Sequence, residues 1–81
     1  MDQTKVYDSS EFQSEIIAAT IKEVADILDE RGYNSINQIV GYLMSGDLAY
    51  ISSYKDARKK IANLDREKVL EALLKNFLEE K

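Results

Sequence analysis

The sequence contains no cysteine and no histidine. The chain therefore has no thiol nucleophile, no disulfide, no imidazole base and few of the side chains that form an ordinary zinc site. On this basis we expect a protein that is not an enzyme and that holds no cofactor and no metal. The lack of cysteine also fits a reducing compartment, and we expect a cytoplasmic protein.

Proline and long apolar runs are missing as well. No uninterrupted apolar stretch approaches the roughly 20 residues that a membrane-spanning helix needs. The first five residues, Met1 to Lys5, are polar and lack the apolar centre of a secretory signal. We therefore expect no insertion into a membrane. Without proline, helices are free to continue until a glycine or a capping residue ends them.

The composition that remains is that of one small acidic domain. The chain has 81 residues, 44% of them hydrophobic, and a net charge of −4. A domain of this size buries only about 60% of its unfolded surface, and oligomerisation commonly supplies the missing stability. The acidic balance disfavours non-specific binding to nucleic acid. We divide the chain into a tail, residues 1–8, and a single helical domain, residues 9–81.

Apolar spacing and capping residues predict two helices in the first part of this domain. The first begins near Glu11 and ends at Gly32, because a residue without Cβ suits the left-handed position after a helix. Its inward stripe is expected to contain Ile17, Ile21, Val24 and Leu28. The second helix follows a cap at Asn34 or Ser35 and ends at Gly46.

Two further helices are predicted after a connector, residues 47–53. Ser52 or Ser53 caps the third helix, and Asp65 caps the fourth, which runs over residues 66–78. The apolar stripe of the fourth helix consists of Val69, Leu70, Leu73, Leu74 and Phe77. The pattern therefore predicts an all-α, compact domain of four to five helices.

The second predicted helix is apolar on nearly every side. Its inward stripe is expected to be Ile36, Ile39, Val40 and Leu43, with Tyr42 and Met44 outside it. A helix of this kind is usually buried, either inside its own domain or between two chains. Gly41 in its middle costs about 1 kcal/mol relative to alanine, and close approach of another helix would explain that cost.

Clustered charges support an alternative function. Lys55, Arg58, Lys59 and Lys60 form a local excess of positive charge on the predicted helix at residues 54–62. Such a helix could contact a DNA backbone, so a small nucleic-acid-binding module is the alternative. It could also dock a phosphate or an acidic partner segment. The carboxylate pairs of the chain fit solvated helix faces better than a general acid.

Thr4 is the residue whose position suggests regulation. A hydroxyl in a terminal tail can enter a kinase active site without unfolding the domain. Phosphate adds about −1.5 to −2 charges and can dock or release the tail near a helix N-terminus or a basic cluster.

A long central segment carries a family resemblance. It contains Gly32-Tyr33-Asn34, Ile36-Asn37-Gln38-Ile39-Val40-Gly41-Tyr42-Leu43, Ser45-Gly46-Asp47, Ala49-Tyr50-Ile51 and Ala57-Arg58. This segment resembles the IreB family of small bacterial regulatory phosphoproteins. The flanking helices agree in length and pattern, so the resemblance extends over nearly the whole chain. Ser35 and Leu48 stand where relatives commonly have proline.

The resemblance implies an all-helical homodimer, intertwined or closely packed, without enzymatic activity. It further implies phosphorylation by a membrane-anchored Ser/Thr kinase with PASTA repeats, a matching phosphatase, and a role in cell-wall stress or antibiotic response. The resemblance also implies that Thr4 falls on one of the N-terminal tail threonines that are phosphorylated in the best-understood member of the family. The downstream protein is unknown. We expect the dimer contact on the second helix, at Ile36, Ile39, Val40, Gly41, Leu43 and Met44.

Overall fold

Four α-helices and two short 3₁₀ helices make up the computed structural model, which describes the backbone of residues 9–79 and the side chains of residues 12–79. The α-helices are α1 (Ser9–Glu30), α2 (Ser35–Ser45), α3 (Ala57–Ala62) and α4 (Arg66–Glu79), and the 3₁₀ helices are η1 (Leu48–Tyr50) and η2 (Tyr54–Asp56). The predicted all-helical class is thus confirmed over the described residues. None of these helices is long and apolar enough to cross a membrane.

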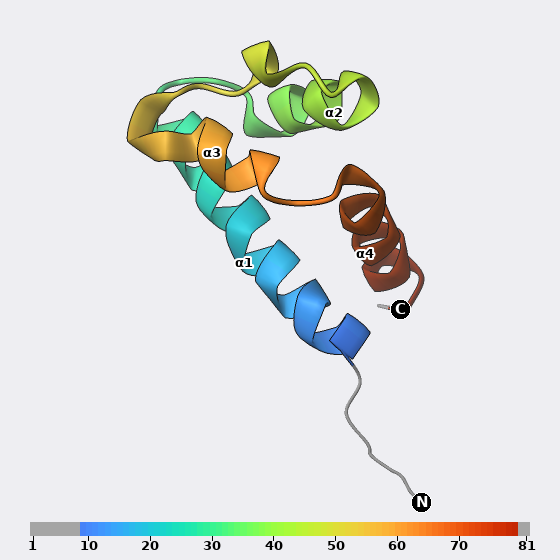
Figure 1. The fold of residues 1–81 in the computed structure, drawn as a ribbon. Coiled ribbons are helices and arrows are strands. Elements are labelled where there is room, and N and C mark those ends of the chain that lie inside the picture. The colour runs from blue at the N-terminus through green and yellow to red at the C-terminus, as the bar shows by residue number, and fades with distance from the viewer. Residues whose placement is uncertain (1–8, 80–81) are drawn as a thin grey trace, which may run out of the picture.

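The long helix α1 is the element on which the others pack. In Figure 1, α2 and α3 lie over its C-terminal half, and α4 lies on the side of its N-terminal half. Its predicted inward stripe faces the core, with Ile21 half-buried and the rest buried. The core contains Ile17, Val24, Ile27, Leu28, Ile39, Tyr42, Leu43, Ile51, Ala57, Ile61 and Val69.

The end of α1 and both ends of α2 form where the capping residues predict them, whereas neither Ser52 nor Ser53 caps α3. Gly32 adopts a φ of 84°, and the backbone N–H of Tyr33 donates to the carbonyl oxygen of Leu28 at 3.0 Å. This is the six-to-one hydrogen bond that closes a helix with a left-handed residue. Asn34 caps α2, since its side-chain oxygen accepts from a backbone N–H in the first turn at 3.1 Å. Gly46, with a φ of 77°, ends α2.

The side of α2 that faces the core differs from the prediction. Its buried residues are Ser35, Ile39, Tyr42 and Leu43, whereas Ile36 and Val40 are exposed. The inclusion of Ile36 and Val40 in the inward stripe was therefore wrong. Because α2 is apolar on two sides, its periodicity did not decide which side lies on α1. The packing against α1 selects the side that carries Tyr42.

The close neighbour of Gly41 comes from the same chain. A Cβ at this position would overlap the ring of Tyr50 in η1, and its separation from Cζ of that ring would be 2.9 Å. The side chain of Gln38 holds η1 in place by donating to the carbonyl oxygen of Tyr50 at 2.9 Å. Within the described residues, the expected approach of another helix at Gly41 is therefore replaced by an aromatic ring.

The third helix is shorter than predicted. Lys55 and Asp56 adopt left-handed backbone angles, with φ of 51° and 63°, so the α-helix starts only at Ala57. Left-handed angles cost a residue with a Cβ roughly 1–2 kcal/mol. The turn brings Ala57 and Ile61 fully into the core. Burial of these two side chains offsets the local strain.

Candidate interaction surface

Helix α4 turns its apolar stripe away from α1. Val69 is buried and Ala72 is half-buried toward the rest of the domain. The other large apolar side chains of α4 are 45–77% exposed. They are Leu70, Leu73, Leu74, Phe77 and Leu78. Their spacing places them on one stripe of the helix, which faces outward except at Leu73, at the edge of the stripe nearest α1.

A second outward stripe lies on α2. Its members, Ile36, Val40 and Met44, follow one another at intervals of four residues and are 51–81% exposed. Soluble monomers rarely expose a contiguous apolar patch of more than a few hundred Å². Two outward stripes in so small a domain therefore indicate surfaces that contact another molecule.

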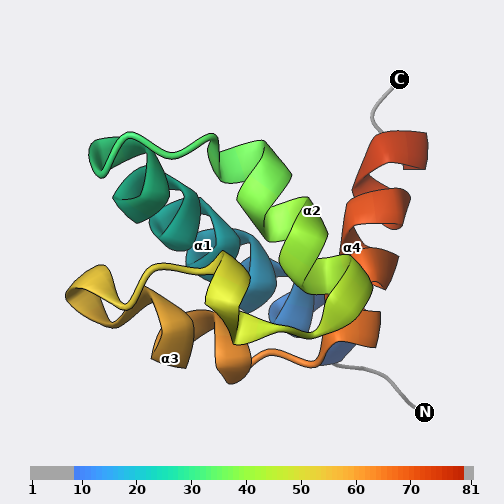
Figure 2. The same ribbon diagram turned by 90° about the horizontal axis from the view of Figure 1, so that it is seen from above.

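Arg66 joins the two helices that carry these stripes. Its Nη1 donates to the carbonyl oxygen of Leu43 at 3.0 Å, and its guanidinium lies against Gly46, where a Cβ would be 2.9 Å from Cζ. Asp65 caps α4 by accepting from the backbone N–H of Glu67 at 3.0 Å. Figure 2 shows α2 and α4 diverging from this shared end. The hydrogen bond from Arg66 and the buried side chain of Val69 together attach the start of α4 to the rest of the domain.

The six residues predicted at a dimer contact divide into two groups. Ile36, Val40 and Met44 are exposed and accessible to a second chain. Ile39 and Leu43 are packed in their own core, and Gly41 faces Tyr50. The dimer contact itself stays a prediction. The outward stripe of α4 was not proposed as a site from the sequence, because apolar spacing does not show which way a stripe points.

Two lysines of the basic cluster form ion pairs with α1. Lys55 Nζ lies 3.2 Å from a carboxylate oxygen of Glu30, and Lys60 Nζ lies 3.3 Å from one of Glu23. The hydrogen bond that Lys55 donates to the Glu30 carboxylate, together with the negative charge of that carboxylate, raises the pKa of Lys55 above its ordinary value. Both lysines therefore help to hold the third helical segment against α1.

Arg58 also makes contacts within the chain. Its Nε donates to the carbonyl oxygen of Ile51 at 2.7 Å and to that of Leu48 at 3.1 Å. It thus ties the connector to α3, and Lys59 is exposed beside it. Three of the four cations of the cluster serve intrachain contacts. This arrangement disfavours the nucleic-acid interpretation of residues 54–62.

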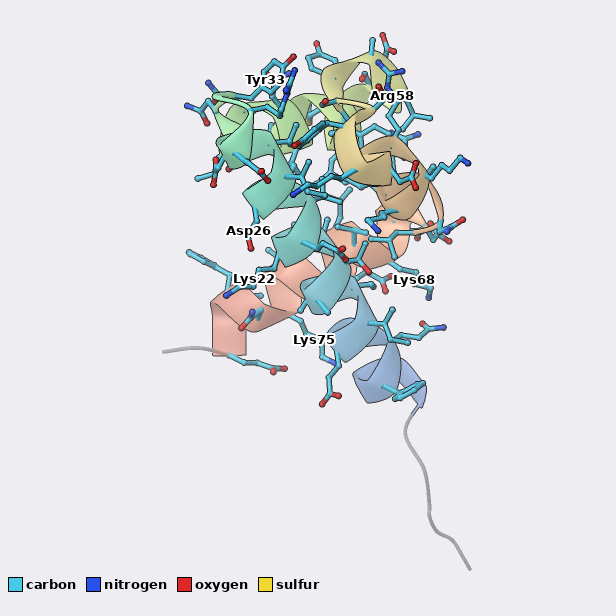
Figure 3. The ribbon with its side chains drawn as sticks, turned by 90° about the vertical axis from the view of Figure 1, so that its left-hand side faces the viewer. Lys22, Asp26, Tyr33, Arg58, Lys68 and Lys75 are labelled. Atoms are coloured by element: carbon cyan, nitrogen blue, oxygen red, sulfur yellow. The ribbon has the colours of Figure 1, made fainter. Side chains whose placement is uncertain are left out.

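A hollow of about 510 Å³ lies between α1 and α4. Its apolar lining is formed by Ile17, Ala18, Ile21, Ala72 and Leu73. Lys22 from α1 and Lys75 from α4 also line it, together with Glu79. A smaller hollow of about 60 Å³ shares Lys75 and includes Lys68. Figure 3 labels these three lysines around the region where α1 and α4 meet.

Thr4 and the rest of the predicted tail, residues 1–8, lie outside the described residues. The candidate site that the structure does describe consists of the two outward stripes and the lysine-lined hollow. These features define a small all-helical domain with two exposed apolar stripes.

The IreB regulatory phosphoprotein family matches residues 2–79 of the chain. Because this match covers nearly the whole sequence, the protein belongs to the IreB family, as the central segment indicates. The family is one of regulatory phosphoproteins, and this supports a regulatory role and is consistent with a protein that is not an enzyme.

Proposed function

We propose that this protein is a non-catalytic cytoplasmic regulator that acts as a homodimer and is controlled by phosphorylation of Thr4. A PASTA-type Ser/Thr kinase adds the phosphate and a matching phosphatase removes it. The regulated process is the cell-wall stress or antibiotic response, through a downstream protein. Membership of a phosphoprotein family supports this proposal. Thr4 supplies the hydroxyl group that accepts the phosphate, since it is the threonine of the segment before Ser9.

The outward stripe of α4 is the main observation that supports the proposed homodimer. A domain of 81 residues gains little from its own core, yet α4 leaves five large apolar side chains in water. A twofold contact buries the same patch on both chains and needs no other partner. The stripe of α2 lies on a helix joined to α4 by Arg66, so a second chain can cover parts of both. Such a contact gives the intertwined or closely packed homodimer.

Light scattering across micromolar concentrations tests the dimer. We expect a mass of twice 9.3 kDa for the unmodified chain. Leu74→Glu places a charge in the α4 stripe and is expected to weaken association at least about tenfold, since it leaves an unpaired charge in an apolar contact. Phe12→Glu is the matched control, because Phe12 is a half-exposed aromatic residue of α1 outside both stripes. A 9.3 kDa species for the unmodified chain would contradict the dimer.

Phosphorylation is tested with the catalytic domain of the cognate kinase. We expect mass spectrometry to place the phosphate on Thr4, and Thr4→Ala to remove it. Thr20, half-buried on α1, is the internal control, since a folded domain protects it from a kinase. Phosphate at other positions only, or no phosphate at all, would remove Thr4 as the switch.

A further inference from the structure

The hollow between α1 and α4 exists because α4 presents its more polar side to α1. Ala72 and Lys75 line both hollows, and Lys68, Asn76 and Glu79 each line one of them, whereas most of the apolar stripe points outward. The α1 side supplies Ile17, Ala18 and Ile21. A site with an apolar floor and lysines at its edge suits a segment that carries both apolar residues and negative charge.

The charges around the hollow leave a positive balance. Lys22, Lys68 and Lys75 stand against two carboxylates, Glu71 and Glu79. Lys68 Nζ lies 3.8 Å from a carboxylate oxygen of Glu71, so the positive charge of Lys68 is already partly neutralised. The ion pairs among residues 12–79 include neither Lys22 nor Lys75. Lys75 lines both hollows and is therefore the central cation.

The segment that precedes α1 is long enough to reach this cation. Ser14 lines both hollows together with Lys75 and stands five residues after Ser9, a rise of about 7.5 Å along α1. Thr4 stands five residues before Ser9, and five extended residues span up to about 17 Å. A segment that folds back along α1 can therefore bring Thr4 to Lys75, while Lys22 lies farther along the helix.

The chemistry of residues 1–8 matches the hollow best after phosphorylation. Lys5 offsets one of the two charges of Asp2 and Asp8, and Val6 and Tyr7 add apolar groups. Phosphate on Thr4 adds about −1.5 to −2 charges and three strong acceptor oxygens. The modified segment therefore carries the negative charge and the apolar groups that the hollow can receive.

We propose that residues 1–8 dock in the α1–α4 hollow of their own chain when Thr4 is phosphorylated, with the phosphate at Lys75. This inference rests on the proposed function and adds how the domain senses the phosphate. Docking bridges α1 and α4 on the side opposite the outward stripe. It thereby links Thr4 to the position of the helix that is proposed to contact a second chain.

Phosphothreonine incorporated at position 4 during synthesis tests this inference without a kinase. We compare amide spectra of the ¹⁵N-labelled chain with phosphothreonine and with threonine at that position, after mass spectrometry confirms the modification. The expected shifts are confined to residues 1–9, 13–22 and 68–79. Raising the salt is expected to reverse them, because exposed charge pairs are screened.

Lys75→Gln removes the central cation and keeps the length of the side chain nearly unchanged. We expect this variant to lose the phosphate-dependent shifts, while Lys59→Gln, an equal charge change on α3, retains them. Circular dichroism checks that both variants keep their helices. Equal shifts in both variants would show that Lys75 does not hold the phosphate and would overturn the inference.

Two other outcomes would also overturn it. The first is an absence of shifts on α1 and α4, or shifts confined to residues 54–62. The second is a set of shifts on a labelled chain without phosphate when it is mixed with an unlabelled phosphorylated chain, which would place the segment on the partner. Each outcome leaves the kinase experiment unaffected, and a failure of the kinase to modify Thr4 leaves this experiment unaffected.

Discussion

The region from α1 to α3 and the helix α4 differ in how many of their large apolar side chains they bury. In the first region Val24, Leu28, Ile51 and Ile61 are completely buried. In α4 only Val69 among the large apolar residues is buried, and the stripe of the helix faces outward. Both regions carry amphipathic helices, so the difference lies in orientation and not in composition.

This difference indicates two sources of stability within one small domain. The first region buries a continuous apolar core, although the α2 stripe of Ile36, Val40 and Met44 stays exposed. Helix α4 is attached near its start by the buried Val69 and by the hydrogen bond from Arg66 to Leu43, and its later turns contribute no buried large apolar side chain. A helix of this kind opens more readily than the core around it. The proposed contacts with another chain and with residues 1–8 are therefore expected to change the stability of α4 first.

Truncating one leucine in each region gives the sharpest test of this comparison. Leu28→Ala removes a fully buried side chain and is expected to lower the free energy of unfolding by about 2–5 kcal/mol. Leu74→Ala removes a side chain that is 59% exposed and is expected to cost less than about 1 kcal/mol in the monomer. Urea unfolding at a dilution where the chain is monomeric measures both. Equal losses would show that α4 packs as firmly as α1.

The contact between Gly41 and Tyr50 tests whether the first region is complete by itself. Gly41→Ala forces the ring of Tyr50 to move, and we expect a loss of about 1–3 kcal/mol. In a Tyr50→Ala background the same change is expected to stabilise the protein by up to about 1 kcal/mol, because alanine is the better helix former. Thermal unfolding of the four chains of this double-mutant cycle gives the coupling. Additive effects would show that the ring of Tyr50 is not what restricts the space at Gly41.

The N-terminal caps of α2 and α4, Asn34 and Asp65, allow the two helices to be compared by the same kind of substitution. Asn34→Ala and Asp65→Ala each remove one side-chain hydrogen bond to a helix N-terminus, and each is expected to cost about 1 kcal/mol. Hydrogen exchange distinguishes their consequences. Loss of the Asp65 cap is expected to speed exchange along α4 only, whereas loss of the Asn34 cap acts through the packed core. Uniform exchange changes in both variants would contradict the division into two regions.

The smallest effect is expected from the ion pair of Lys55 with Glu30. This pair raises the pKa of Lys55 above 10.5, so its contribution is complete below that pH and is lost as the pH rises through the raised pKa. Because the ammonium is exposed, the loss is small. Unfolding midpoints measured from about pH 9 upward should fall more for the unmodified chain than for Lys55→Met. Parallel curves would show that the pair adds nothing.

The local features of the fold could be predicted because they depend on neighbouring residues. Gly32 and Gly46 end helices in left-handed conformations, and Asn34 and Asp65 supply capping oxygens, as their residue types indicate. The inward stripe of α1 also follows from spacing, since the other faces of that helix are largely polar or small. The break at Lys55 and Asp56 could not be predicted, because lysine does not favour left-handed angles and the tolerance of aspartate for them does not by itself mark a turn.

The sequence by itself determined an all-helical, acidic domain of the IreB family, with helices that begin and end at recognisable caps. Only the tertiary structure decided which side of α2 is buried and that the stripe of α4 points outward. It also decided that Lys22 and Lys75 line the same hollow. The physical reason is that caps and periodicity act over a few residues, whereas the rotation of a helix is chosen by competition among all the surfaces that it can contact.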